Sequence, residues 1–128
     1  MAGRTLNIVS SAYRATLEEQ DDTVLWLVHA MRAAGAEMDV VLRGNAVNYA
    51  ARGQDASGLF FGARRQTQPP RLDESVLALA RVGVRVFVVA DDLEARGVER
   101  SDLVQGVTTI PRNAVAKLCT DYDRVWHW

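Results

Sequence analysis

The chain has 128 residues, of which 48% are hydrophobic, and its 15 basic and 16 acidic residues give a net charge of -1. This composition excludes a disordered chain, and the absence of a basic tract or stripe argues against a nucleic-acid partner. The longest apolar runs are too short to cross a bilayer, so we predict a single domain over residues 1–128 that does not interact with membranes.

Strand and helix patterns alternate from the beginning of the chain. Residues 5–11 form a short apolar run with β-branched side chains, which predicts a strand. The helix expected next ends near Gly35, and Thr16 with Glu19 three residues later fits a capping box. One face of this helix is predicted to carry the apolar residues Leu17, Val24, Leu27, Val28 and Met31. A second strand over residues 37–44 and a short helix over 45–53 follow.

Residues 54–71 break this rhythm, because they hold two glycines, two prolines and little periodicity. They predict a long loop, a kind of segment that is often functional or mobile. The triplet Leu59, Phe60 and Phe61 is unusual for a solvated loop. We expect the triplet either to fold back onto the body or to contact another subunit, with a flap over a ligand as the alternative.

The second half of the chain resumes the alternation. A helix is predicted over residues 72–83, a central strand over 85–89 and a short helix over 91–97. A strand over 107–111, a helix over 112–122 and a terminal strand over 123–128 complete the pattern. Apolar strands that alternate with helices predict an α/β fold with three α/β/α layers and a mostly parallel five-stranded sheet, flavodoxin-like in general architecture.

Right-handed crossovers would place the carboxyl ends of the strands on one rim, where such folds bind ligands. The candidate rim residues are Ser10, Ser11, Tyr13, Gly44, Asn45, Asp91, Asp92, Pro111 and Arg112. The glycine-rich loop of phosphate-binding proteins is missing after the first strand. Ser10, Ser11 and Thr16 could instead hydrogen-bond an anion, although capping of the following helix is the favoured interpretation.

Asp91 and Asp92 directly follow the central strand. With Asp91 as the N-cap and Glu94 at the third helical position, the segment fits the aspartate form of a capping box, and Gly97 would end the helix. A magnesium site would need further carboxylates or phosphates, which the other strand ends do not offer. We therefore interpret the pair as a helix cap, with ligand contact as the alternative, and expect no metal and no cofactor.

The remaining chemically active side chains are isolated in the sequence. His29 and His127 lack a spaced partner that would indicate a metal site or a catalytic triad. Trp126 and Trp128 share one face of the terminal strand and are expected at a core edge or a subunit interface. The single cysteine, Cys119, excludes an intrachain disulfide and a cysteine zinc site, which fits a reducing cytoplasm. It lies on an apolar helical stripe, so we expect a buried, unreactive thiol.

The order of these motifs resembles the DsrE/DsrF-like family over nearly the whole chain except residues 54–70. The most specific piece is VFVVADDLEARGVERSDLVQGV, which is similar to the family's gVrVyvC…lexRGl…dLveGv pattern. The resemblance implies a three-layer α/β/α domain that assembles into trimers or hexamers, homomeric or mixed. It also implies intracellular sulfur chemistry, with persulfide sulfur carried on a cysteine at the end of the central strand.

The sequence departs from the family pattern at that strand end, because residues 89–92 contain no cysteine and Cys119 lies elsewhere. No catalytic residue of the family therefore has a matching position here. We expect a non-catalytic, cytoplasmic, oligomeric member related to sulfur metabolism, acting as a subunit or binding a small ligand. Its expected partners are further copies of itself and other sulfur-relay proteins. The alternatives are sulfur transfer through Cys119 or a partner's cysteine, and an anion- or nucleotide-binding rim formed by Ser10, Ser11, Asn45 and Arg112.

Overall fold

A five-stranded sheet forms the centre of the molecule in the computed structural model, which describes residues 3–13, 22–54 and 58–128. The strands are β1 (Thr5–Val9), β2 (Met38–Leu42), β5 (Val86–Val89), β6 (Val107–Ile110) and β7 (Arg124–His127). They pair in the order β6-β5-β2-β1-β7, and every pairing in this sheet is parallel. The predicted α/β class and the five-stranded parallel sheet are therefore confirmed.

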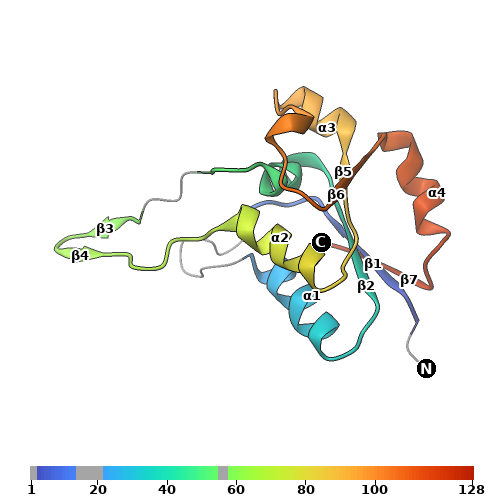
Figure 1. Ribbon diagram of the computed structural model, residues 1–128, viewed down its shortest axis with the longest axis horizontal. Helices are drawn as coiled ribbons and strands as arrows, with labels where there is room; N and C mark the ends of the chain where they lie inside the picture. Colours follow the sequence, from blue (N-terminus) through green and yellow to red (C-terminus); the bar gives the residue numbers. More distant parts are fainter. Residues whose placement is uncertain (1–2, 14–21, 55–57) are drawn as a thin grey trace.

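Helices cover the two faces of this sheet unequally (Figure 1). Helices α1 (Thr23–Ala33) and α2 (Leu72–Arg81), with the 3-10 helix η1 (Gly44–Ala50), pack on one face and form the larger core with the alternate residues Val40, Val86 and Val88. The short helix α4 (Val115–Cys119) packs on the other face, over a smaller core that includes Leu6 and Val41. Successive residues of a strand point to opposite faces, so the central strands β1, β2 and β5 are largely apolar because both faces of the sheet are covered there.

The carboxyl ends of the strands lie along one edge of the sheet, because every strand of this sheet runs parallel to its neighbours. Val9 pairs with Leu42, and Ile8 pairs with His127 on the other side of β1. Val89 pairs with Ile110. The residues that directly follow these strand ends are therefore neighbours on the rim, although they are far apart in the sequence.

Helix α1 begins with Asp22 as its N-cap, whose carboxylate accepts hydrogen bonds from the backbone N–H groups of Val24 and Leu25, at 2.9 and 3.2 Å. Val24 and Val28 are buried as predicted, whereas Leu25 occupies the interior position that the sequence pattern gave to Leu27. The expected capping box of Thr16 and Glu19, and Leu17 on the helix face, lie outside the described residues. No helix in the described part of the chain is long and apolar enough to cross a membrane.

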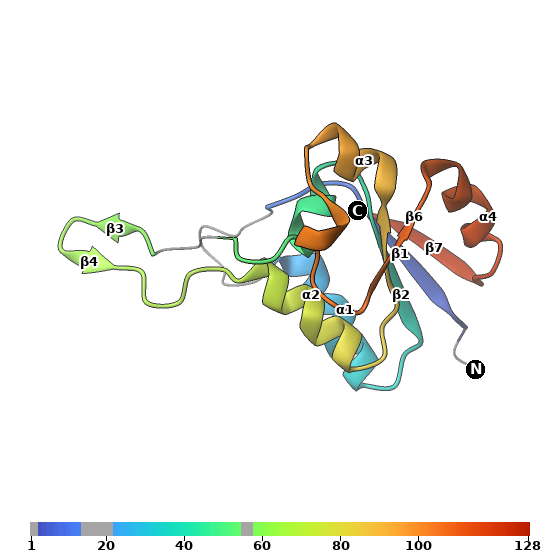
Figure 2. The ribbon, with the colours of Figure 1, turned by 45° about the horizontal axis from the view of Figure 1, so that its top comes forward.

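The segment predicted as a long loop contains a β-hairpin, formed by β3 (Phe60–Phe61) and β4 (Arg64–Arg65). Gly62, at φ +64°, begins its two-residue turn, a position where hairpins favour glycine because other residues rarely adopt a positive φ. The hairpin extends away from the rest of the molecule (Figure 2). Leu59, Phe60 and Phe61 are 45%, 70% and 59% exposed, so the expectation that they fold back onto the body is wrong.

The predicted helix over residues 112–122 is shorter in the structure. A 3-10 turn, η3 (Arg112–Ala114), leads into α4, which ends at Cys119. Beyond it, the N–H groups of Thr120, Asp121 and Tyr122 each bond to the carbonyl three residues earlier, so the chain tightens into turns. This early end lets Tyr122 lie over the sheet at the start of β7.

Candidate functional site

Asp92 is the centre of a hydrogen-bonded cluster on the rim. It lies in the first turn of α3 (Ala90–Ala95) and is 9% exposed. Its Oδ2 accepts a hydrogen bond of 2.8 Å from the backbone N–H of Gly44, which follows β2. Its Oδ1 lies 2.6 Å from Nη2 of Arg112, which follows β6. One carboxylate therefore joins the segments that follow three neighbouring strands.

The predicted capping box of Asp91 and Glu94 is wrong. Helix α3 begins directly at Ala90 with Val89 as its N-cap, so both aspartates lie inside the first turn and their side chains point toward neighbouring segments. Asp91 Oδ1 accepts a hydrogen bond of 2.7 Å from the backbone N–H of Arg112 instead of capping its own helix. The two acidic groups still lie near the helix N-terminus, where the helix dipole favours negative charge.

The surroundings of Asp92 keep its carboxylate ionised. Burial by itself would raise the pKa, but the hydrogen bond from Gly44 and the charges of Arg112 and Arg96 outweigh burial and lower it. The same contact raises the pKa of Arg112. An ionised carboxylate that is held by these partners is suited to fixing three segments together, and poorly suited to acting as a proton donor.

Asn45 joins this cluster through Arg96, a residue that sequence reasoning missed. Its Oδ1 accepts hydrogen bonds from Nε and Nη2 of Arg96, at 3.1 and 2.8 Å. Arg96 Nη1 also donates to the carbonyl oxygen of Asp92, at 3.1 Å. Two sequence signals point to Arg96: its spacing of four residues from Asp92, which places both on one side of a helix, and the arginine of the lexRGl pattern.

Ser10 lies beside this cluster and pairs with the last strand. Its Oγ is 2.9 Å from Nε2 of His127, because β1 and β7 are adjacent. A serine–histidine pair needs a third group that orients the histidine before it becomes an activated nucleophile. Within the described segments no carboxylate is hydrogen-bonded to His127. A Cβ added at Gly44 would lie 3.4 Å from the carbonyl oxygen of Ser10, which shows how closely the two parts of the rim approach.

The other predicted rim residues lie further from Asp92 or make no contribution to its cluster. Tyr13 adopts a φ of 61°, packs edge-to-face on Tyr49 and donates its N–H to the Tyr49 hydroxyl. Tyr49 in turn donates to Oδ2 of Asp22 at 2.7 Å, and burial together with this bond raises its pKa. Ser11 is exposed, and Pro111 is exposed as the residue before η3.

The terminal tryptophans pack at the edge of the larger core, one of the two places expected for them. Trp126 and Trp128 are half-buried there and meet edge-to-face, with ring centroids 6.3 Å apart. The indole Nε1 of Trp128 donates to Oδ1 of the buried Asn7, at 3.1 Å. Asn7 also bonds to the carbonyl of Asp39, so the pair is fixed to the sheet.

Cys119 lies on α4, on the sheet face that carries the smaller core, and not on the rim beside Asp92. It packs against that core but is half-buried, so the expectation of full burial is only partly correct. Since it is the one cysteine of the chain, the rim contains no thiol. Among the residues that the structure describes, no cluster of three His, Cys, Asp or Glu side chains could hold a metal ion.

A second polar cluster lies at the opposite edge of the sheet, around Asp39 of β2. Its carboxylate accepts hydrogen bonds from Nε and Nη2 of Arg85 and from the Tyr122 hydroxyl, at 3.1, 2.9 and 2.6 Å. Arg4 lies 3.6 Å away. Burial raises the pKa of Asp39, against the opposing effects of Tyr122 and Arg4. Sequence reasoning missed this cluster, which fixes the end of the α4 segment to the sheet.

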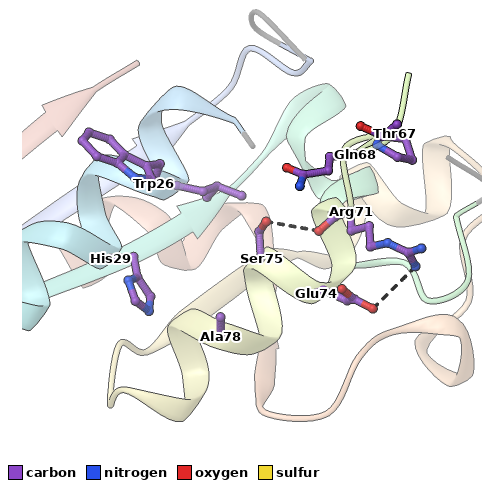
Figure 3. A pocket seen from close by; sticks show the side chains of 10 residues that line it. Trp26, His29, Thr67, Gln68, Arg71, Glu74, Ser75 and Ala78 are labelled. Atoms are coloured by element: carbon purple, nitrogen blue, oxygen red, sulfur yellow. Dashed lines mark hydrogen bonds and ion pairs between the residues drawn. The ribbon is translucent and has the colours of Figure 1, made fainter. Parts of the chain in front are cut away.

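A cavity of about 490 Å³ lies between α1, α2 and residues 67–71 (Figure 3). Trp26 and His29 of α1 line one side, and Ser75 and Ala78 of α2 line the other. Trp26 is 59% exposed, which is unusual for so large an apolar side chain. The sequence predicted neither this groove nor the exposure of Trp26, because both depend on how α1 and α2 pack together.

Comparison with known proteins relates the whole chain to one family and one fold. The protein-family model described as the DsrE/DsrF-like family matches residues 8–127. No curated protein matches the chain. The solved structure of the ychN protein from E. coli is 19% identical, with a TM-score of 0.71 over 98% of this chain and 99% of that chain.

Two structures of proteins of unknown function are also similar. MTH1491 from Methanobacterium thermoautotrophicum is 15% identical, with a TM-score of 0.65 over 96% of this chain and 97% of its own. BT1422 from Bacteroides thetaiotaomicron is 13% identical, with a TM-score of 0.68 over 97% of this chain and 94% of its own. At these identities the likeness shows a shared fold.

Proposed function

The chain belongs to the DsrE/DsrF-like family, and from this premise we propose that it keeps the family's scaffold without a sulfur-carrying cysteine of its own. It acts as a non-catalytic subunit or small-ligand-binding member in intracellular sulfur metabolism. The observation that carries this proposal is Asp92. It lies in the first turn of α3, within residues 89–92, the stretch in which the family resemblance places the persulfide cysteine, and its carboxylate is bound to Gly44 and Arg112.

The chemistry of the rim supports this role. A carboxylate cannot carry sulfane sulfur, because persulfide formation requires a thiolate as the nucleophile. The hydroxyl of Ser10 is the nearest alternative, but the histidine beside it has no orienting carboxylate within the described segments. The rim therefore supports positioning of the three loops better than it supports a covalent reaction.

Self-association is part of the proposed role. In a cytoplasmic oligomer, a trimer or hexamer with copies of itself or with other sulfur-relay proteins, this subunit would shape the assembly while a partner supplies the thiol. The support on the chain itself is the set of exposed aromatic side chains on the β3–β4 hairpin. Monomeric proteins rarely expose such a group of large apolar residues without a partner.

The direct test is the intact mass of the protein after incubation with a sulfane-sulfur donor, with Cys119→Ser as the control. We expect no mass gain in either protein, and slow reaction of Cys119 with a thiol reagent until the protein is unfolded. A gain of one sulfur atom that the Cys119→Ser variant loses would overturn the proposal. It would make Cys119 the carrier.

Sulfur transfer through Cys119 is the second candidate, and the half-buried state of this residue favours it over a fully closed core position. Its location on α4 counts against it, since this helix packs on the face of the sheet away from α1 and α2. An anion site at the rim has less support. Arg112 is already paired with Asp92, and Asn45 presents its oxygen to Arg96.

A further inference from the structure

We propose that the β3–β4 hairpin of one copy of this chain docks into the groove between α1 and α2 of a second copy. The groove is the cavity lined by Trp26, His29, Ser75, Ala78 and residues 67–71. This inference rests on the self-association proposed above and names the two surfaces that carry it. The occupant is a hairpin of the same sequence, and each copy offers both a hairpin and a groove.

The hairpin has the features of a surface that binds a partner. Phe60 pairs across the hairpin with Arg65, and Phe61 pairs with Arg64, so each face presents one aromatic ring and one guanidinium. The Arg65 guanidinium lies 5.7 Å from the Phe60 ring centre. An isolated two-stranded hairpin is marginally stable in water, because it buries too little apolar surface. Docking would supply the burial that the hairpin does not obtain from its own chain.

The groove offers complementary chemistry. Its volume of about 490 Å³ lies in the range of sites that enclose drug-sized molecules, so it has room for aromatic side chains. Trp26 and His29 lie on one side of it and Ser75 and Ala78 on the other (Figure 3). An aromatic ring placed between these two helices would cover the exposed indole of Trp26, and such aromatic contacts dominate the energy of many interfaces.

The charges of the groove are compatible with this occupant, since its lining residues Arg71 and Glu74 balance each other. Residues 58–66 of the hairpin contain Arg64 and Arg65 and no acidic residue. The groove carries the carboxylate of Glu74, which is largely exposed and only 3.8 Å from Arg71 in a surface ion pair. An arginine of the incoming hairpin can share this carboxylate, or stack on Trp26 as cations do on aromatic faces.

The arrangement of the two surfaces requires a second copy. The hairpin extends outward from the molecule in both views, so it points away from its own groove (Figures 1 and 2). Residues 67–71 lead from the hairpin and then form one wall of the groove, which places both surfaces side by side. Two copies related by a twofold axis can therefore exchange hairpins reciprocally, as one of the contacts within a hexamer.

The dimensions agree with this exchange. From Leu59 to Gly62 an extended strand covers about 10 Å, at about 3.4 Å per residue. From Leu72 to Ala78 the helix α2 covers about 9 Å, at about 1.5 Å per residue. The hairpin is thus long enough to lie along the groove without entering the core.

Directed cross-linking tests the contact itself. In a Cys119→Ser background, a Phe61→Cys chain is mixed with an Ala78→Cys chain under oxidising conditions. We expect a disulfide-linked pair that contains one chain of each kind. The matched control replaces Ala78→Cys with Val82→Cys, at the end of α2 and outside the groove, and should not cross-link. Equal yields from the two positions, or no link at Ala78→Cys, would overturn the docking.

The mass of the assembly provides a second measurement. We expect the Phe60→Ser/Phe61→Ser double variant to raise the dissociation constant by roughly a hundredfold, as loss of a central aromatic contact does. Trp26→Ala should have a similar effect from the acceptor side, while Val82→Ser should leave association unchanged. Sedimentation measures the dissociation constant of the wild type and of these three variants. Association of the double variant at wild-type strength would reject the hairpin as the contact and leave the proposed function standing.

A wild-type protein that remains monomeric at every concentration would reject both this contact and the self-association proposed above. The sulfane-sulfur experiment would still report independently on whether the chain carries sulfur. The two sets of results therefore separate a wrong surface from a wrong function.

Discussion

Asp92 connects three loops with one side chain, so its removal tests what holds the rim together. Changing Asp92→Asn keeps the size of the side chain but removes the charge that Gly44 and Arg112 bind. We expect a loss of about 1–2 kcal/mol in the free energy of unfolding, because Arg112 remains largely in solvent. Urea denaturation measures the loss. The control is Glu94→Gln on the exposed side of α3, which should change stability by less than about 0.5 kcal/mol.

The lowered pKa of Asp92 makes this stabilisation depend on pH. Its folded-state pKa lies below the unfolded value of about 3.9, so the ionised form favours the folded state. The stability difference between wild type and Asp92→Asn should be fully present above the unfolded pKa. It should decrease as the pH falls through the folded pKa. Urea denaturation at a series of pH values measures this difference, and a difference that does not change with pH would contradict it.

Asp39 should show the opposite behaviour, because burial raises its pKa. The folded protein takes up a proton at Asp39 before the unfolded chain does. Its titration therefore favours the fold most at low pH, and this contribution is lost as the pH rises through the folded pKa. In the same series, the stability of wild type relative to Asp39→Asn should increase as the pH falls. Because the two variants should change with pH in opposite directions, each serves as the control for the other.

At the scale of single elements, α4 depends on a contact beyond its own end. Val115 packs the start of α4 on the sheet, and the Tyr122 hydroxyl bonds to Asp39 beyond its last turn. Changing Tyr122→Phe should destabilise the fold by about 1–2 kcal/mol and let α4 open more often. Opening exposes Cys119, so its rate of reaction with a thiol reagent under native conditions should increase. Asp121→Asn, one residue earlier and exposed, should leave that rate unchanged.

The central strands β1, β2 and β5 could be predicted from the sequence, because they are short runs rich in valine and other apolar residues that both faces of the sheet bury. The hydrogen bonds of the Asp92 carboxylate could not be predicted in the same way. Its bond partners Gly44 and Arg112 lie 48 and 20 residues away, and a capping box is a pattern of neighbouring residues. Local patterns indicate the elements, whereas the rim is made by how the elements pack. The Ser10–His127 contact joins residues 117 apart and has no local signal.

The β3–β4 hairpin could not be predicted from the sequence either, for a different reason. Residues 54–71 lack the length of alternating apolar pattern that predicts strands, and β3 and β4 have two residues each. Their pairing depends mainly on the two-residue turn at Gly62. The apolar triplet was correctly recognised as unusual, but its exposure could be learned only from the three-dimensional structure.

At the scale of the whole molecule, the hairpin should be separable from the fold. Leu59 and Gln66 already face each other at its base, where the Gln66 N–H donates to the Leu59 carbonyl. Replacing residues 60–65 by Asn-Gly, a sequence that favours tight hairpin turns, should therefore close the chain there. We expect the free energy of unfolding of the dissociated subunit to change by less than about 1 kcal/mol. Denaturation at low protein concentration measures this change, while sedimentation should show that self-association is lost. Failure of the shortened protein to unfold cooperatively would show that the hairpin belongs to the folding unit.

The order of the strands also has a consequence for biosynthesis. β1 lies between β2 and β7, so one of its edges is paired early in the chain and the other by residues 124–127. A ribosome that adds about 5–20 residues per second needs on the order of ten seconds to proceed from β1 to β7. During that interval the nascent chain exposes an open strand edge beside Leu6 and Ile8, the kind of edge to which other strands add. The pace of translation over the second half of the message therefore determines how long the nascent chain must avoid unwanted pairing.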